Sequence, residues 1–168
     1  MENSSKIIIL RGNSGSGKTT VANALQKKLG RGTLIISQDV IRREMLWVRD
    51  GSETKAISLL INLVKYGKEN CNFVIVEGIL NAVWYKELFE IIKLEFKSST
   101  YAYYYDLSFE ETLQRHQTKL NCNEFGENDM KQWWNEKDFI ESIEEKILSQ
   151  ELSIDETVDI IIKDITES

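Results

Sequence analysis

The segment GNSGSGKT, from Gly12 to Thr19, constrains the fold of this chain more than any other feature. It matches the pattern G-x-x-x-x-G-K-[ST] in full, and it follows the apolar run KIIIL, from Lys6 to Leu10. Glycine is entropically costly in an ordered segment, so three glycines here indicate a backbone that must stay bare. Loops of this pattern cradle phosphates between a strand and a helix. The pattern therefore predicts a strand, a phosphate-binding loop and a helix.

Each residue type in this P-loop suits a nucleotide. We expect Gly15 and Gly17 to permit close backbone approach, Lys18 to contact the β- and γ-phosphate oxygens, Thr19 to offer a hydroxyl to Mg²⁺ and Thr20 to touch the α-phosphate. The alternative interpretation is a Gly/Ser turn without a ligand. The predicted nucleotide-binding residues of the loop are Gly12, Asn13, Ser14, Gly15, Ser16, Gly17, Lys18, Thr19 and Thr20.

Composition limits the class of partner. The chain has 168 residues and a net charge of −6, which disfavours long nucleic acid because backbone phosphates need a basic surface. Cys71 and Cys122 lack metal-ligand or C-x-x-C spacing and fit a reducing compartment. We see no signal peptide and no apolar run of membrane-spanning length. These features predict one cytoplasmic domain over 1–168 that binds no membrane.

Short apolar runs alternate with amphipathic segments along the chain. Apolar residues recur at helical spacing in segments that begin near Val21, Ala56, Trp84, Phe109 and Ile154, and Ser153 to Glu156 matches a capping box. This alternation predicts a three-layer α/β fold with a parallel sheet. We expect strands at 6–10, 33–37, 73–77 and 101–107, with a fifth around 146–148.

The segment 120–137 interrupts this alternation. It mixes asparagines, glycine, acidic residues and two tryptophans, and it is too long for an ordinary connection. Long connections in compact domains often act as lids, so we expect a lid insert here, with a short helix around 129–135.

Four segments, taken in chain order, resemble the small P-loop kinases. They are RGNSGSGKTTVA, SQDVIRREM with Asp39 and Arg42, VIVEGI with Glu77, and YYYDLSFEETLQRHQTK with Arg115. The chain is similar to the nucleoside-monophosphate-kinase-like group, which includes shikimate and gluconate kinases, chloramphenicol phosphotransferase, zeta toxins and polynucleotide kinase; VIVEGI is also similar to uridine kinases. A GTPase reading is disfavoured, since the chain has no N-K-x-D sequence.

The resemblance implies a P-loop NTPase fold with a five-stranded parallel sheet in the order 2-3-1-4-5. It also implies ATP and Mg²⁺ as cofactors, and a lid that closes over ATP. The γ-phosphoryl group would pass to a hydroxyl of a small-molecule acceptor. By this resemblance Lys18, Asp39 and Arg115 are the catalytic candidates, and Arg115 and Lys119 contact the nucleotide.

Asp39, Arg42 and Glu77 each have a second interpretation. Asp39 could orient the acceptor hydroxyl or simply favour a helix N-terminus. Arg42, three residues on, could clamp the acceptor or form a weak ion pair with Asp39. Glu77 ends an apolar strand, where a carboxylate is expensive to bury without a partner. It could serve Mg²⁺ together with Thr19, bind acceptor hydroxyls, or make a structural bond.

Arg115 and the composition of the lid bear on whether the protein can catalyse phosphoryl transfer or can only bind the nucleotide. Arg115 could neutralise the transferring charge or form a surface ladder with Glu111 and Lys119. The segment 120–137 contains no arginine, although such lids often supply two or more, and lysine cannot form a planar bidentate clamp.

Aromatic residues are the remaining acceptor candidates. We expect one of Trp133 and Trp134 to face the cleft, with Trp134 assigned to the acceptor, and Trp47 and Met45 to shape the pocket. His116 is expected to be structural.

The leading hypothesis is a kinase of a nucleoside or nucleoside-like compound. A 5′-hydroxyl RNA or DNA kinase and a non-catalytic ATP-binding switch stay open. The oligomeric state is left as monomer or homodimer.

Overall fold

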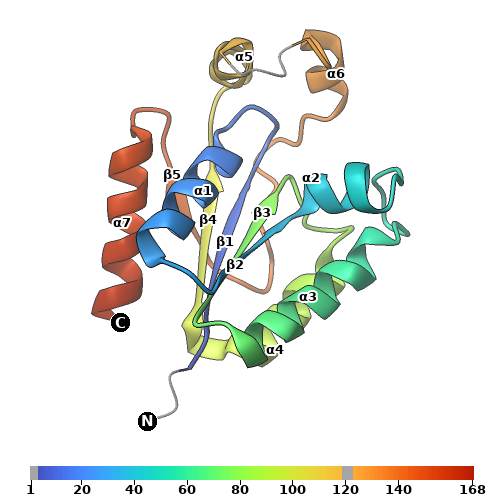
Figure 1. Cartoon of the computed structure of the whole chain (residues 1–168). Coiled ribbons are helices and arrows are strands. Elements are labelled where there is room, and N and C mark those ends of the chain that lie inside the picture. Colours follow the sequence, from blue (N-terminus) through green and yellow to red (C-terminus); the bar gives the residue numbers. More distant parts are fainter. Residues whose placement is uncertain (1–3, 119–122) are drawn as a thin grey trace.

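The computed structural model describes residues 4–118 and 123–168 and is built around a parallel five-stranded sheet (Figure 1). The strand order is β2-β3-β1-β4-β5, and every neighbouring pair is parallel. The predicted α/β class and the order 2-3-1-4-5 are confirmed. The strands are β1 (Lys6–Gly12), β2 (Thr33–Ser37), β3 (Phe73–Gly78), β4 (Thr100–Tyr105) and β5 (Glu145–Leu148).

The central strand β1 is apolar because both of its faces are covered. Ile7 and Ile9 belong to the core shared with α3 and α4, whereas Ile8 and Leu10 belong to the core shared with α1 and α7. All four side chains are fully buried. This arrangement explains why the run KIIIL lacks the polar alternation of a half-exposed strand.

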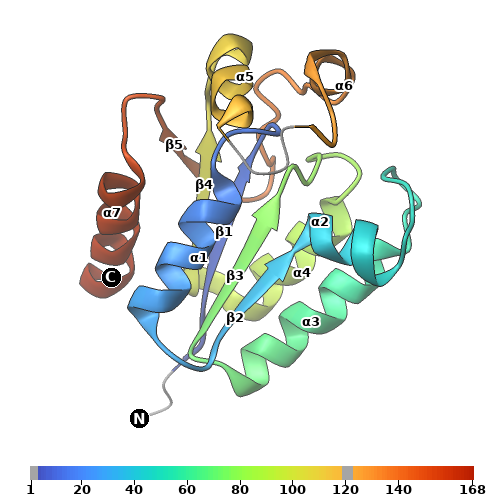
Figure 2. The same cartoon turned by 45° about the horizontal axis from the view of Figure 1, so that its top comes forward.

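Long helices cover the two faces of the sheet (Figure 2). Helices α1 and α7 pack on one face, and α3 and α4 pack on the other. The core is thus divided into two layers, as in other three-layer α/β proteins. The bounds are α1 (Lys18–Leu29), α3 (Ala56–Asn70), α4 (Lys86–Phe96) and α7 (Ile154–Glu167).

Shorter helices lie at the ends of the sheet. α5 and α6 lie above the carboxyl ends of the strands, and α2 with η1 follows β2 at the same edge (Figure 1). η1 is a π-helix, which is rare and often marks a functional site. The bounds are α2 (Gln38–Val40), η1 (Ile41–Met45), η2 (Lys97–Ser99), α5 (Phe109–Gln117) and α6 (Glu127–Gln132).

Several predicted boundaries shift by a few residues. Strand β1 continues through Arg11 to Gly12, whereas β4 ends at Tyr105, and the helix expected from Trp84 begins at Lys86. The helix expected at 129–135 spans Glu127–Gln132. The capping box before α7 is present: the Ser153 side chain accepts from the Glu156 amide, and the Glu156 carboxylate accepts from the Ser153 amide.

Candidate active site

The P-loop connects β1 to α1, and its glycines are required by their neighbours. Gly12 has a φ of 147°, and a Cβ there would lie 2.9 Å from the Cβ of Tyr105. Gly15 has a φ of 83°, and a Cβ there would lie 2.4 Å from the carbonyl oxygen of Thr112 in α5. The absence of a side chain at Gly15 therefore also allows α5 to pack directly on the loop. From the sequence, this glycine was explained by close approach of the ligand alone.

The side chain of Lys18 bends back over the loop. Its ammonium donates to the carbonyl oxygen of Asn13 at 2.8 Å and to the hydroxyl of Ser16 at 3.0 Å. Lys18 is 7 % exposed. The loop thus holds a positive charge against its own backbone, at the position where a phosphate group would bind.

Glu77 lies beside the P-loop at the carboxyl end of β3 and is buried. One of its oxygens, Oε1, accepts from Thr19 Oγ1 at 3.1 Å and from Ser37 Oγ at 2.7 Å. These contacts are the partners that a buried carboxylate needs. Strand pairing sets them, because Ser37 and Glu77 are register partners across β2 and β3.

The Thr19 hydroxyl and Glu77 carboxylate suit Mg²⁺ bound chiefly by nucleotide phosphates. Magnesium usually keeps several waters and takes only one or two protein oxygens at such sites. The described residues contain no group of three or more His, Cys, Asp or Glu side chains that could hold a metal by themselves. The donor set therefore fits a nucleotide-bound Mg²⁺ and not an all-protein metal site.

A cavity of about 450 Å³ lies between the P-loop, the α2–η1 segment, the loop after β3 and the described part of the predicted lid, 123–137, which is called the lid below. Lys18 and Thr19 line it from the P-loop side, so the phosphate-binding loop and the cavity are continuous. Its other charged lining residues are Asp39, Arg42, Arg43, Arg49 and Asp50, and its aromatic ones are Trp84, Phe125 and Trp133.

Asp39 and Arg42 form the ion pair that was one of the two interpretations of Arg42, and both residues also line the cavity. Arg42 Nη2 lies 3.0 Å from Asp39 Oδ1, and Arg43 Nε lies 3.2 Å from the same oxygen. The guanidinium of Arg43 also lies 5.6 Å from the ring centroids of Phe125 and Trp133 in the lid. Arg43 thus links η1 to the lid, a contact that sequence reasoning missed.

A buried tyrosine joins two of the residues that line the cavity, Gln38 and Asp50. Tyr85 donates to Asp50 Oδ1 at 2.6 Å, and the Gln38 amide donates to the Tyr85 hydroxyl and to Asp50 Oδ2. Burial, and then the bond to Asp50, raise the pKa of Tyr85 well above its ordinary value. Tyr85 therefore stays a protonated donor, and the Asp50 carboxylate is held by neutral groups.

Two predicted acceptor residues do not line the cavity. Trp47 is 91 % exposed, because η1 ends before it and its φ of 52° turns the chain outward. Trp134 packs edge-on against Phe109, with ring centroids 5.4 Å apart, and donates to Glu136. Trp133 faces the cavity instead. Met45 is also exposed and lies outside the lining.

Arg115 reaches from α5 to the P-loop. Its Nε pairs with Glu111 at 2.9 Å, its Nη1 donates to the Ser16 carbonyl at 2.8 Å, and its Nη2 donates to the Gln150 carbonyl at 3.0 Å. Arg115 thus combines the surface-ladder contact with a position against the phosphate loop. The predicted contact of Lys119 lies outside the described residues.

The trailing end of the lid is tied to the P-loop through Asn13. The side-chain Nδ2 of Asn13 donates to the backbone carbonyl oxygen of Asn135, and the side-chain Oδ1 of Asn13 accepts from the backbone N–H of Asn135, both at 2.7 Å. The side chain of Asn81, after β3, donates to Asn135 Oδ1 at 3.1 Å. Asn13 was predicted as a nucleotide contact, and the structure shows in addition that its side chain bonds to Asn135 in the lid.

Arg11 forms a second tie that sequence reasoning missed. This fully buried guanidinium pairs with Glu145 and Asp138, each at 2.8 Å, and donates to the Leu80 carbonyl. An arginine within an otherwise apolar strand was the signal, since such a charge needs buried partners. His116 is structural as expected, with its Nε2 at 2.8 Å from the Phe125 carbonyl oxygen.

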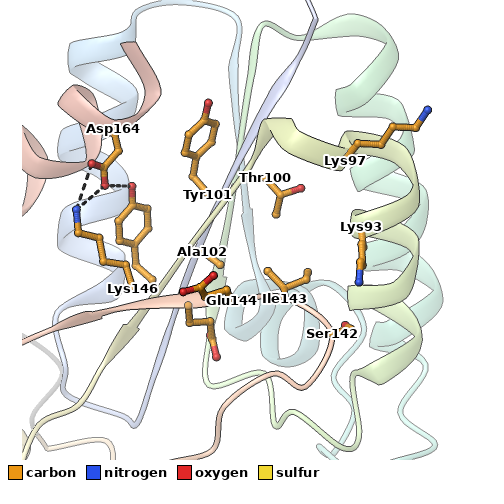
Figure 3. A pocket seen from close by; sticks show the side chains of 12 residues that line it. Lys93, Lys97, Thr100, Tyr101, Ala102, Ser142, Ile143, Glu144, Lys146 and Asp164 are labelled. Atoms are coloured by element: carbon orange, nitrogen blue, oxygen red, sulfur yellow. Dashed lines mark hydrogen bonds and ion pairs between the residues drawn. The ribbon is translucent and has the colours of Figure 1, made fainter. Parts of the chain in front are cut away.

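A second cavity, of about 550 Å³, lies between α4, the β4–β5 strands and α7, and contains none of the predicted site residues (Figure 3). One of its three acidic residues, Asp164, is already paired: Tyr103 donates to it at 2.8 Å and Lys146 at 3.0 Å. Although it is larger, this cavity does not touch the P-loop, so the chemistry is placed at the first cavity.

Comparison with known families agrees with this geometry. A sequence profile described as an AAA domain matches residues 7–140, which include the P-loop, Glu77 and Arg115. The chain belongs to this AAA domain family. A search of curated proteins finds no match for this AAA domain.

Solved structures share the fold of this AAA domain at low sequence identity. An APS kinase of Mycobacterium tuberculosis, solved with AMPPNP and APS, is 18% identical with a TM-score of 0.67, over 98% of this chain and 99% of that one. A gluconokinase of Sinorhizobium meliloti is 13% identical with a TM-score of 0.67, over 96% and 92%. A shikimate kinase of Aquifex aeolicus is 20% identical with a TM-score of 0.53, over 96% of each chain.

No helix within 4–118 or 123–168 is long and apolar enough to span a bilayer.

Proposed function

We propose that this protein is an ATP- and Mg²⁺-dependent phosphotransferase that moves the γ-phosphoryl group of ATP to a hydroxyl of a small molecule. The observation that carries the proposal is the continuity between the P-loop and the cavity: Lys18 and Thr19 line the same space as Asp39. A triphosphate in the loop would direct its γ-phosphoryl group toward an acceptor in that cavity. The fold shared with kinases named for APS, gluconate and shikimate supports the same reaction class.

In the proposed reaction, the acceptor oxygen forms a bond to the γ-phosphorus while the bond from that phosphorus to the bridging oxygen of ADP breaks. Asp39 would orient the hydroxyl and take its proton. Lys18 and Arg115 would balance negative charge on the transferring group, since such reactions depend mainly on positioning and charge stabilisation. Thr19, with Glu77 acting through water, would hold the Mg²⁺ that draws charge from the phosphate oxygens.

The acceptor we propose is a nucleoside or a nucleoside-like compound, as in the uridine-kinase-like and nucleoside-monophosphate-kinase-like proteins that the sequence resembles. Trp84 and Trp133 line the cavity and offer flat surfaces for a ring. We also propose a cytoplasmic location, with a monomer or homodimer as the working unit.

Two other functions have support of their own. Three arginines in the cavity favour a 5′-hydroxyl RNA or DNA kinase, although the net charge of −6 opposes binding to long nucleic acid. The absence of arginine from 120–137 favours an ATP-binding switch without turnover.

Incubation with Mg·ATP and pooled acceptors distinguishes the three. The pools are nucleosides, sugars, aminoglycoside and phenicol antibiotics, and short 5′-hydroxyl oligonucleotides, and Lys18→Ala is the blank. Acceptor-dependent ADP release that Asp39→Asn abolishes supports the small-molecule kinase. Release only with oligonucleotides supports the second function. ATP binding with no ADP above the blank in any pool overturns the kinase proposal.

A further inference from the structure

We propose that the acceptor is an anionic aromatic molecule, whose acid group binds Arg42 and Arg49 and whose ring contacts Trp84 and Trp133. The inference rests on the proposed function, because it names the substrate class of the same cavity. Of the acceptors proposed above, it favours an anionic nucleoside-like compound over a nucleoside, since a neutral nucleoside would leave the acid-binding groups unused.

The distribution of arginine is the first observation. The chain has six arginines and a net charge of −6, yet three of the six line this cavity. All three lie between positions 42 and 49 of the chain. Arginine presents a planar fork of donors that matches carboxylate and phosphate groups, so its concentration at one wall indicates an anionic ligand.

Arg42 has an unused donor. Its side chain is 18 % exposed, and its Nη2 is bound to Asp39 at 3.0 Å. Its Nε is buried and has no hydrogen-bond partner among the residues that the structure describes. A buried donor without an acceptor costs about 1–3 kcal/mol, and Arg42 lines the cavity, so a ligand oxygen that reached this nitrogen would remove that cost.

Arg49 supplies a second charge. It is exposed, lines the cavity and forms no ion pair with any residue in 4–118 or 123–168. The neighbouring Asp50 accepts from Tyr85 and Gln38. Arg43, by contrast, is occupied by Asp39 and by the two lid rings. We therefore assign the acid group to Arg49 and to Arg42, which pairs with Asp39 through Nη2 but keeps an unused Nε.

The aromatic part of the proposal rests on two tryptophans from different elements. Trp84 follows β3 and is 41 % exposed, and its backbone amide donates to Asn81 Oδ1 at 3.0 Å. Trp133 belongs to the lid and contacts Phe125 edge-on, at 5.1 Å between ring centroids. Both line the cavity. Two aromatic side chains that line one cavity favour a flat ligand.

The test measures binding without turnover. ¹⁵N-labelled protein is saturated with Mg·AMPPNP, which fills the P-loop, and titrated with benzoate, phenyl phosphate or benzyl alcohol. These probes share a ring and differ in charge. The arginine Nε–H signals are followed by NMR and assigned from Arg42→Gln and Arg49→Gln. Arg31→Gln, at an exposed arginine outside the cavity, is the matched control.

At least one anion should shift the Arg42 signal and bind at least about tenfold more tightly than benzyl alcohol. Arg42→Gln and Arg49→Gln should each weaken that binding at least about threefold, and Arg31→Gln should not. Binding of benzoate alone assigns a carboxylate, and binding of phenyl phosphate alone assigns a phosphate. The inference is overturned if neither anion moves the Arg42 signal, if the alcohol binds equally well, or if both cavity variants bind the anions like the wild type.

Failure of the inference is distinguishable from failure of the proposed function. If Arg49→Gln phosphorylates a neutral acceptor at the wild-type rate, the anionic-acceptor inference is wrong and the proposed kinase activity is supported. Anion binding without ADP release in any pool would leave the inference and remove the kinase. Wild-type affinity of both cavity variants for Mg·AMPPNP would show that they are folded.

Discussion

At the residue scale, Glu77 is a buried carboxylate held by two hydroxyl groups at the end of β3, and we propose that it serves a metal–nucleotide complex. One oxygen accepts hydrogen bonds from two hydroxyls, Thr19 and Ser37, while the side chain is enclosed by the sheet. A magnesium ion carried by ATP would compete for the Thr19 hydroxyl, and Ser37 would still orient the carboxylate. Outer contacts of this type commonly tune metal affinity.

Replacing Glu77 by Gln should raise the Mg²⁺ concentration for half-maximal activity by about tenfold or more, because the carboxylate charge near the metal is lost. The measurement is ADP release against Mg²⁺ concentration at saturating ATP. Ser37→Ala, which keeps the charge and removes one donor, is the matched control and should shift this concentration much less. An unchanged Mg²⁺ requirement in Glu77→Gln would contradict the assignment.

Arg115 is held by three groups at once, on α5, the P-loop and the segment after β5. Only a guanidinium has enough donors in one plane for this arrangement. Arg115→Lys should therefore lower kcat by about a hundredfold or more, nearly as much as Arg115→Ala, with a smaller effect on ATP affinity. Single-turnover assays alongside ATP titration separate the two effects. Full activity in Arg115→Lys would show that charge alone suffices.

At the scale of elements, the lid is coupled to the P-loop at both of its ends. The α5 backbone packs on Gly15 before the lid, and Asn135 bonds to Asn13 after it. The carbonyl of Asn13 also accepts from Lys18. A nucleotide that draws Lys18 away would thus act on the same residue that holds the lid.

Asn13→Ala should loosen the trailing end of the lid, because the Asn135 amide loses its acceptor. Hydrogen exchange of that amide should accelerate by about tenfold, which corresponds to loss of one hydrogen bond of roughly 1.4 kcal/mol. Exchange is read by NMR or mass spectrometry, with Ser14→Ala as the neighbouring control. Equal exchange in Asn13→Ala and wild type would rule out the tie.

The start of α7 offers a pH-dependent prediction. The backbone amide of Ser153 donates to Glu156 and lowers the pKa of that carboxyl. A lowered folded pKa adds stability that is present above the unfolded pKa, near 4.5, and is lost as pH falls through the folded value. Glu156→Gln should therefore have a lower Tm than the wild type at pH 7, and the difference in Tm should disappear in acid, below the folded pKa of Glu156. A difference in Tm that stays constant with pH would contradict this prediction.

At the scale of the whole molecule, the Arg11 cluster joins β1, β5 and the loop after β3. Arg11→Met should destabilise the protein by about 3–5 kcal/mol, because Glu145 would be left buried and charged without its partner. The double variant Arg11→Met/Glu145→Gln should recover part of this loss, since the amide removes the charge and keeps an acceptor for Ile140. Urea unfolding measures both, and a loss under about 1 kcal/mol in Arg11→Met would contradict the account.

Local patterns were sufficient to predict the strands and the parallel sheet, whereas the strand order came from the resemblance to small P-loop kinases. The apolar run before Gly12 and the capping box at Ser153 are short-range signals, and the structure agrees with them. The P-loop could be identified for the same reason, because the pattern that defines it lies in consecutive residues, Gly12 to Thr19.

The walls of the cavity could not be predicted in this way. Trp133 and Trp134 are neighbours in sequence, and only the direction of the chain after α6 decides which one faces the cavity. Trp47 does not line the cavity and has a left-handed backbone conformation, which the local sequence does not predict. Arg43 contacts Phe125 and Trp133, which are distant from it in sequence, and sequence spacing does not predict such contacts.

The most direct test of the central claim follows the phosphoryl group itself. Wild-type protein and Lys18→Ala are incubated with Mg·ATP labelled with ¹⁸O on the γ-phosphoryl group, together with the acceptor pools, and the products are weighed by mass spectrometry. The account predicts that one small acceptor gains a phosphoryl group carrying the label, and only with the wild type. Label found solely in inorganic phosphate, or retained in ATP in every pool, would contradict it.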